Sequence, residues 1–289
     1  MKSARALTRT ITILGLVCIL WVIIAPSCMR FRINDESAKK KFQKKGLTLV
    51  TSFFRVRHMV LHYVKTGLDS LPTIVFIHGS PGSWNAFENY LEDSDLLRNY
   101  RLISIDRPGF GYSDFGKVLH LNEQSELITR FLSTINNGKP LYLVGHSLGG
   151  PMAVKLAAEN QKLINAIVIL AGSLDPAQEG PEWWRKILDK TPLYYFVPGA
   201  FRPSNRELLY FKDDVHGLAD NFAKVTCRVY LVHGDADKWV PPGNVAYATK
   251  KLINARAVEV HILEGANHFI PWTRYNAIKT LLMQLDRSE

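Results

Sequence analysis

The sequence predicts an α/β fold in which a mostly parallel sheet is covered by helices on both faces. Short apolar runs alternate with longer helical stretches, and several runs end in glycine-rich turns, as parallel strands followed by crossover helices do. The expected strands are 47–64, 72–77, 101–105, 140–144, 164–170, 228–233 and 257–263, and the expected helices are 85–93, 121–136, 148–160, 243–253 and 272–285. The first run is expected to open the sheet in antiparallel fashion.

The N-terminus predicts a membrane segment. Residues 10–29 carry no charge, are mostly aliphatic and are bracketed by basic residues. Twenty such residues are long enough for a helix that spans a bilayer. We expect a single-pass anchor, and two alternatives stay open: a lipoprotein attached through Cys28, which follows a loose lipobox, or a secreted chain whose signal is cleaved. The expected organisation is an anchor or signal at 1–29, a basic linker at 30–45 and a folded domain at 46–289.

The positive charge gathers near that segment. The chain has a formal net charge of +10, but residues 1–45 hold ten Lys and Arg against two acidic residues, so the remainder carries only +2. This distribution argues against a nucleic-acid partner. The lysines of the linker either face anionic headgroups or form a solvated connection. The side of the membrane that the folded domain faces stays open.

Two glycine-rich loops follow early strands. The run 72–77 leads into His78-Gly79-Ser80-Pro81-Gly82, ahead of an expected helix. The run 101–105 leads into the turn 106–114, which reads Asp-Arg-Pro-Gly-Phe-Gly-Tyr-Ser-Asp. A backbone N–H that approaches a developing negative charge needs a loop of this small-residue type.

The segment Gly145-His146-Ser147-Leu148-Gly149 predicts a nucleophile. It lies between the apolar run 141–144 and the Ala-rich stretch 151–159, which is the strand, tight turn and helix of a nucleophile elbow. Glycines two residues to either side of the serine let the strand and the helix pass closely. Ser147 is then exposed beside a helix N-terminus and the N–H of Leu148, placed to attack a carbonyl.

A serine nucleophile needs a base and an acid, and candidates follow in the chain. His268 comes just after the last expected strand, where a base can reach the serine. Asp237 lies in the loop after the run 228–233. Asp235, in the same loop, more plausibly braces the backbone, and Asp175 is a third candidate for the acid. Among other histidines, His233 and His261 lie in or at the end of strands and are expected to pack, and His216 belongs to a lid.

The chain resembles the α/β-hydrolase family over roughly residues 70–272, through these four motifs in their order. The resemblance implies a triad of Ser147, Asp237 and His268, with the N–H groups of Ser80 and Leu148 as the oxyanion hole. It also implies that His78 braces its loop, that the turn 106–114 is architectural, and that the aromatic-rich insertion at about 173–226 is a lid. Some lid aromatics are expected to line the substrate entrance.

We therefore expect a serine hydrolase that transfers an acyl group to water, acting on a small apolar ester as carboxylesterases and lipases do. The same triad in this family also serves C–C bond hydrolysis, perhydrolysis or haloperoxidation and prolyl aminopeptidase activity. A ligand-binding protein without catalysis is the alternative of another class. Serine replaces the aspartate nucleophile of epoxide hydrolases and haloalkane dehalogenases. No metal-ligand spacing or phosphate loop is present, and Cys227 is the folded domain's one cysteine, so we expect neither cofactor nor metal.

Overall fold

The computed structural model describes residues 2–180 and 182–285 and has the expected α/β architecture. An eight-stranded sheet runs in the order β1-β2-β4-β3-β5-β6-β7-β8. β1 pairs antiparallel with β2 and β2 with β4, and the other neighbours are parallel. The strands are β1 Val50–Val56, β2 Met59–Thr66, β3 Thr73–Ile77, β4 Arg101–Ile105, β5 Leu141–His146, β6 Ala166–Leu170, β7 Arg228–Gly234 and β8 Ala257–Leu263.

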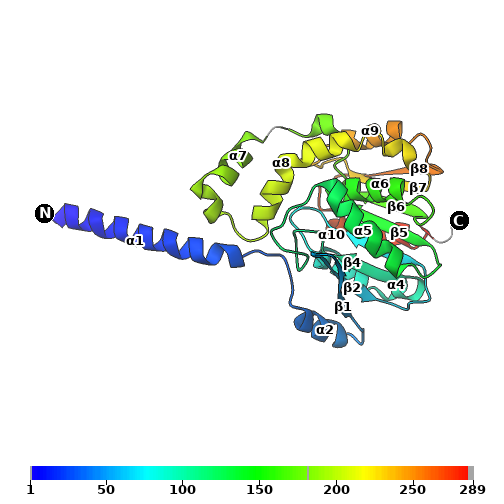
Figure 1. Cartoon of the computed structure of the whole chain (residues 1–289), viewed down its shortest axis with the longest axis horizontal. Coiled ribbons are helices and arrows are strands. Elements are labelled where there is room, and N and C mark those ends of the chain that lie inside the picture. The colour runs from blue at the N-terminus through cyan, green and yellow to red at the C-terminus, as the bar shows by residue number, and fades with distance from the viewer. Residues whose placement is uncertain (1, 181, 286–289) are drawn as a thin grey trace.

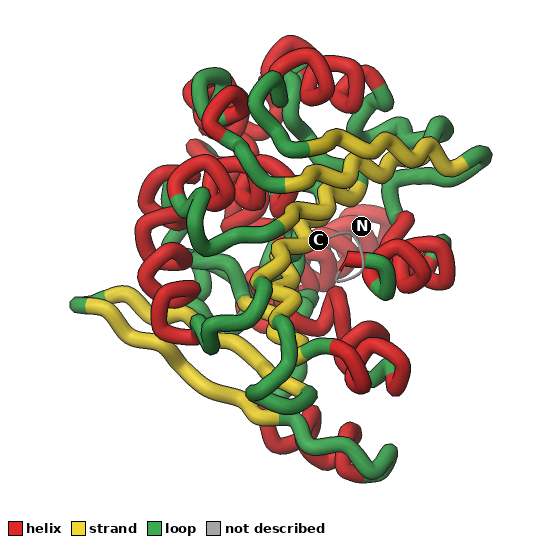
Figure 2. Tube along the Cα trace, turned by 90° about the vertical axis from the view of Figure 1, so that its right-hand side faces the viewer, coloured by secondary structure: helices red, strands yellow, loops and turns green. Residues whose placement is uncertain are grey.

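Helices cover both faces of the twisted sheet, as Figure 2 shows. Successive residues of β3 point to opposite faces: Val75 and Ile77 join one core with α5, α6 and α9, and Ile74 and Phe76 join the other with α2, α3, α4 and α11. These helices are α2 Asp35–Gln43, α3 Glu88–Leu91, α4 Ser94–Asn99, α5 Leu121–Ile135, α6 Gly149–Glu159, α9 Gly243–Lys251 and α11 Tyr275–Leu282. The two-sided burial explains why the parallel strands read as continuous apolar runs.

Two expected elements divide in the structure. The run 47–64 forms a hairpin, because the chain turns at Arg57, whose φ is +53°. The helix expected at 272–285 is two, α10 Ile270–Thr273 and α11, with Arg274 between them in a non-helical conformation. The helix expected at 85–93 begins as the 3₁₀ turn η2 Trp84–Phe87 before α3.

The basic segment at 30–45 contains the packed helix α2. Asn34 caps this helix by accepting hydrogen bonds from the N–H groups of Glu36 and Ser37. Phe42 is completely buried in the core beneath the sheet. Lys41 pairs with Glu88 of α3 at 2.6 Å, and Lys45 pairs with Glu92. These two lysines therefore bind the domain itself, a use that composition does not reveal.

A lid lies between β6 and β7, in the place that the sequence indicates for it. It contains η3 Pro176–Gln178, α7 Trp183–Lys190, η4 Pro192–Phe196, α8 Phe201–Gly217 and η5 Phe222–Lys224. The apolar helix α1 Lys2–Ile24 and the turn η1 Ala25–Ser27 precede the domain, and α1 projects away from it beside the lid (Figure 1). The stretch Arg5–Ser27 is long and apolar enough to cross a membrane.

Candidate active site

Ser147 lies in a strained turn between β5 and α6. Its φ is +54°, a left-handed conformation that residues with a side chain seldom adopt. A Cβ on Gly145 would lie 2.1 Å from the carbonyl oxygen of Gly149, so only glycine fits there. Gly79 approaches from the loop after β3, and a Cβ at that position would lie 2.9 Å from the Cβ of Ser147. The nucleophile elbow that the sequence indicates thus has the required backbone geometry.

Asp237 and His268 are joined by a hydrogen bond. Nδ1 of His268 donates to Oδ2 of Asp237 at 2.7 Å, and the other carboxylate oxygen accepts from the N–H groups of Trp239 and Val240 at 2.9 Å each. Burial alone would raise the pKa of Asp237, but hydrogen bonds from His233, His268 and Val240 outweigh it and hold this pKa far below its usual range. The carboxylate is therefore ionised, which keeps the proton of His268 on Nδ1 and leaves Nε2 able to act as a base.

His146 connects the elbow to His268, and sequence reasoning missed it. Its Nε2 donates to the carbonyl oxygen of His268 at 3.0 Å, and the two imidazole rings lie 4.9 Å apart. Burial, with the charge of His268, lowers the pKa of His146 to about 3, so this ring stays neutral. Its one sequence signal is its place directly before Ser147. This contact holds together the turns that carry Ser147 and His268. Both residues are only 5% exposed, so the exposed position expected for Ser147 is wrong, because the loop after β3 and the lid pack beside its turn.

The loop after β3 is held by its own histidine. His78 Nδ1 donates to the carbonyl oxygen of Gly79 at 2.6 Å, and Nε2 accepts from the N–H of Arg107 at 2.9 Å. Burial lowers the pKa of His78 well below its usual value, which agrees with a neutral bracing ring. Ser80 follows Gly79, which contacts Ser147, and Leu148 follows Ser147 at the start of α6. Both residues expected to provide the oxyanion hole therefore adjoin the elbow.

A buried ion pair fastens the lid to this loop, and no sequence motif announced it. Arg107 and Glu207 of α8 form a two-pronged pair, with nitrogen to oxygen distances of 2.6 and 2.9 Å. Arg107 also donates to the carbonyl oxygens of His78, at 2.9 Å, and Gly79, at 3.3 Å. The exposed fractions of Arg107 and Glu207 are 1% and 5%. Because Arg107 bonds both partners, the lid and the loop after β3 hold each other in place.

Apolar side chains lie beside Ser147 and His268. Phe211 and Val215 of α8 form a small buried cluster with Leu148. The ring of Trp239 lies 5.6 Å from that of His268, and the ring of Trp272 lies 5.3 Å from that of His146. The buried cluster keeps water from the Leu148 side of the site, whereas both tryptophans are partly exposed.

The turn 106–114 is built around a buried carboxylate. Asp106 accepts from the N–H groups of Trp84, at 2.7 Å, and Tyr112, at 2.8 Å, and from Nδ1 of His62 at 2.8 Å. His62 in turn lies 3.2 Å from Asp35 of α2. These bonds fit the architectural role expected for the turn, and they tie the N-terminal segment to it.

The other candidate acids have local partners. Asp235 accepts from the N–H of Gly265 at 2.7 Å, which braces the turn before His268. Asp175 caps η3 by accepting from the N–H of Ala177. His233 donates to the carbonyl oxygen of Val240 at 2.9 Å and supports the acid's loop. Among the described residues, Asp237 is thus the candidate that bonds His268.

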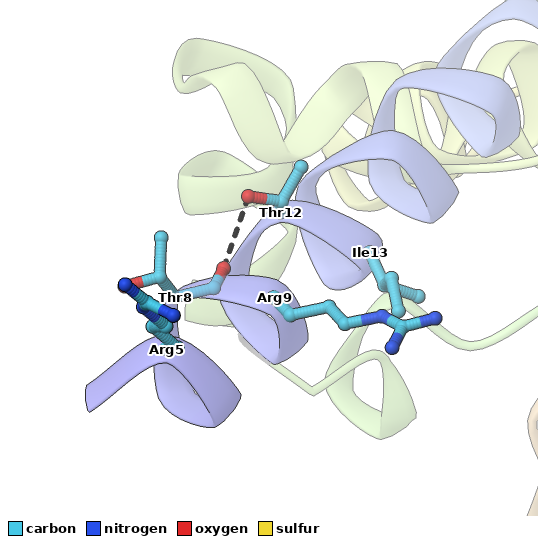
Figure 3. A pocket seen from close by; sticks show the side chains of 5 residues that line it. All are labelled: Arg5, Thr8, Arg9, Thr12 and Ile13. Carbon is cyan, nitrogen blue, oxygen red and sulfur yellow. Dashed lines mark hydrogen bonds between the residues drawn. The ribbon is translucent and has the colours of Figure 1, made fainter. Parts of the chain in front are cut away.

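The remaining candidates lie apart from the elbow. His261 is exposed on the edge strand β8, and His216 is exposed on α8. No group of three His, Cys, Asp or Glu residues is arranged to hold a metal within 2–180 and 182–285. A hollow on α1 has a volume of about 470 Å³. Figure 3 shows the side chains that line it, none of which is a candidate catalytic residue: Arg5, Thr8, Arg9, Thr12 and Ile13.

Comparisons with known proteins agree with this geometry. A family model described as the alpha/beta hydrolase fold matches residues 72–195. Epoxide hydrolase 1 of Caenorhabditis elegans is 28% identical over 146 residues, which cover 48% of this chain and 35% of that protein. A 2-hydroxy-6-oxononadienedioate/2-hydroxy-6-oxononatrienedioate hydrolase of Burkholderia vietnamiensis is 30% identical over 146 residues, 48% of this chain and 47% of that one. The matches thus span less than half the length of these curated relatives.

One similar solved structure includes the N-terminal helix in its match. The crystal structure of a membrane phospholipase A aligns over 99% of this chain and 99% of its own, with a TM-score of 0.58 and 19% identity. At that identity the likeness shows the fold alone.

Proposed function

Because the chain belongs to the α/β-hydrolase fold family, we propose that it is a serine hydrolase that transfers an acyl group from an apolar ester to water. The observation that carries the proposal is the bond between Asp237 and His268 beside the strained elbow of Ser147. A backbone held in a rare, strained conformation is a common mark of a functional residue.

The proposed reaction has two steps. The Oγ of Ser147 attacks the ester carbonyl while Nε2 of His268 takes the hydroxyl proton. The N–H groups of Ser80 and Leu148 bind the oxyanion that forms. The C–O bond then breaks, and the leaving alcohol takes the proton from His268. Water, deprotonated by the same histidine, attacks the acyl-enzyme, releases the acid and restores Ser147. Asp237 orients His268 and stabilises its charged form in both steps.

The relatives support this chemistry unequally. The Burkholderia enzyme is described as a hydrolase of an oxononadienedioate, which keeps C–C bond hydrolysis as the second candidate. Epoxide opening is less well supported, since serine occupies the position of the aspartate nucleophile of epoxide hydrolases.

The nucleophile is tested by substitution. Ser147→Ala should lower kcat for p-nitrophenyl butyrate at least about 10³-fold, because the oxyanion hole and binding alone retain only a residue of the rate enhancement. Ser133→Ala, an exposed serine of α5, is the control and should leave the rate unchanged. Hydrolysis by Ser147→Ala within a few-fold of the wild-type rate would refute the proposal.

We also propose that α1 anchors the chain in a membrane. Its side-chain hydroxyls are satisfied within the helix: Thr10 donates to the carbonyl oxygen of Ala6, and Thr12 to that of Thr8, as Figure 3 shows for the latter. A lipid environment requires such internal bonds. The alternatives of acylation at Cys28 or cleavage remain as outcomes of a test.

The anchor is tested by extraction. The full chain should sediment with membranes and stay there in high salt, because burial of apolar residues in lipid is not screened by ions. Intact mass separates the alternatives: an unprocessed chain indicates a spanning helix, and a chain that begins at an acylated Cys28 indicates a lipoprotein. An unacylated, shortened chain in the soluble fraction would refute membrane attachment.

A further inference from the structure

The lid exposes large apolar side chains next to the N-terminal helix. Trp183 of α7 is 70% exposed, and Leu193 and Tyr195 of η4 are 49% and 56% exposed. Ile187 and Phe196 are also exposed in the same segment. Large exposed apolar side chains that gather in one segment indicate an interaction site, whereas scattered single ones do not. We call these five residues, with Phe201, the apolar lid face.

Helix α7 exposes large apolar side chains although one of its acidic side chains has a partner within the lid. Arg206 of α8 pairs with Asp189 at 2.8 Å, and Asn205 of α8 donates to the backbone carbonyl oxygen of Arg185 at 3.1 Å, whereas Lys186 and Lys190 are exposed. Its apolar residues Trp183 and Ile187 point outward. A helix that packs on a protein core in water shows the reverse arrangement.

The apolar lid face lies beside the C-terminal end of α1. The indole nitrogen of Trp21, which lies inside the uncharged stretch 10–29, donates to the carbonyl oxygen of Phe196 at 2.9 Å. The N–H of Gly199 donates to the carbonyl oxygen of Ala25 at 2.9 Å, and the N–H of Ala200 donates to that of Met29 at 3.1 Å. Figure 1 shows α7 on the same side of the domain as α1, beside its last turns.

We infer that the apolar lid face lies in the interfacial layer of the bilayer that α1 spans, and that the site hydrolyses acyl esters of bilayer lipids. Because Phe196 is bonded to a residue inside the span, its neighbours on η4 and α7 lie at the depth where a membrane meets water. Tryptophan and tyrosine favour that depth. Helix α8 runs from Phe201 of this face to Phe211 and Val215, which pack on Leu148 beside Ser147, so one helix connects the face with the site. The inference rests on the proposed esterase activity and anchor.

The depth of the lid is measured on the full chain in phosphatidylcholine nanodiscs. A nitroxide is attached to Leu193→Cys, and in a matched variant to Ile253→Cys, an equally apolar, 72% exposed residue next to α9, far from α1. Cys18 and Cys28 are replaced by serine, and Cys227 is buried. The label at 193 should collide with oxygen and be shielded from a water-soluble nickel chelate, and the label at 253 should do the opposite. Equal nickel accessibility at the two positions would overturn the inference.

The second test compares hydrolysis of a soluble ester with hydrolysis of lipids in vesicles. Leu193→Glu with Tyr195→Glu should hydrolyse soluble p-nitrophenyl butyrate at the wild-type rate but release fatty acid from vesicles of mixed phosphatidylcholine, phosphatidylethanolamine and diacylglycerol at least tenfold more slowly. Ile253→Glu should match the wild type in both assays. Undiminished release by the double variant, or no release by a wild type that cleaves the soluble ester, would overturn the inference. A wild type inactive on soluble esters would count against the proposed function instead, and the nitroxide measurement would still decide the depth of the lid.

Discussion

The two ends of helix α8 belong to different surroundings. Near its N-terminus, Phe201 is 37% exposed and packs edge-on against Phe31, at 5.6 Å between ring centres, beside the segment that leaves α1. Farther along, Glu207 and Phe211 are buried against Arg107 and Leu148. One end contacts the segment that follows α1 through apolar groups, and the other contacts the loop after β3 through a buried charge. The surroundings of Ser147 therefore depend on specific partners, whereas the outer lid depends on the nature of its surface.

The largest effect should come from Asp237, the proposed acid beside His268. Asp237→Asn should lower kcat by about 10⁴-fold, because an amide favours the wrong tautomer of His268. Asp235→Asn is the matched control two residues away and should change kcat little, since its side-chain oxygen still accepts from the N–H of Gly265. Steady-state kinetics with p-nitrophenyl butyrate measure both. The reverse ranking would move the acid to Asp235.

The next effect concerns the ion pair of Arg107 and Glu207, which joins the lid to the loop after β3. Glu207→Gln leaves Arg107 as a buried charge with a weaker partner, which should cost about 3–5 kcal/mol of stability. A displaced oxyanion loop should also lower kcat by up to about 100-fold. Asp213→Asn, the same change of charge on an exposed position of α8, is the control. Equal kcat and thermal midpoints in the two variants would show that the inner end of α8 is no more constrained than its surface.

A smaller, pH-dependent effect concerns His62, which lies between Asp35 of α2 and Asp106 of the turn 106–114. Burial lowers the pKa of His62, but its bonds and charge interactions with Asp106 and Asp35 outweigh this, so the pKa is raised; the rings of Phe53 and Tyr112 are its other neighbours. A raised pKa stabilises the fold fully below the unfolded value of about 6.5, and this is lost as pH rises through the folded value.

The thermal midpoint of the wild type should therefore fall between pH 6 and pH 9 more steeply than that of His62→Gln. Each unit of pKa shift corresponds to about 1.4 kcal/mol. In a domain of this size each kcal/mol moves the midpoint by about 2–4 °C. Parallel pH profiles for the two chains would exclude His62 as the titrating contact.

The smallest effect is expected at the outer end of α8. Phe201→Ala should change kcat for the soluble ester by no more than about twofold, as exposed substitutions away from a site usually do. Steady-state kinetics with p-nitrophenyl butyrate measure kcat for this variant, as for Glu207→Gln. A loss as large as that of Glu207→Gln would remove the contrast between the two ends of the helix.

The same contrast explains what the sequence could predict. The succession of strands along the chain, the elbow at Ser147 and the positions of Asp237 and His268 follow from short local patterns, because each of these three residues comes after an apolar run. The structure confirms the fold. It also brings together the turns that carry Ser147, Asp237 and His268. Their catalytic roles remain predictions until activity is measured.

Contacts between distant segments left no local signal. The pair of Arg107 and Glu207 joins residues 100 positions apart, and nothing in the pattern of α8 distinguishes Glu207 from Asp213, which is exposed. Phe42 sits in a run of lysines that indicates a solvated linker, yet it packs in the core. Burial by a remote segment decides such cases, and a single sequence does not report it.

The central claim, that Ser147 is the nucleophile of a hydrolase, is tested most directly by a fluorophosphonate and mass spectrometry of the digested protein. The account predicts one phosphonylated peptide with the adduct on Ser147, loss of esterase activity in proportion to labelling, and no adduct in Ser147→Ala. It also predicts slow labelling in Asp237→Asn, whose histidine is misoriented. An adduct on another serine, or a wild type that hydrolyses esters while remaining unlabelled, would contradict the account.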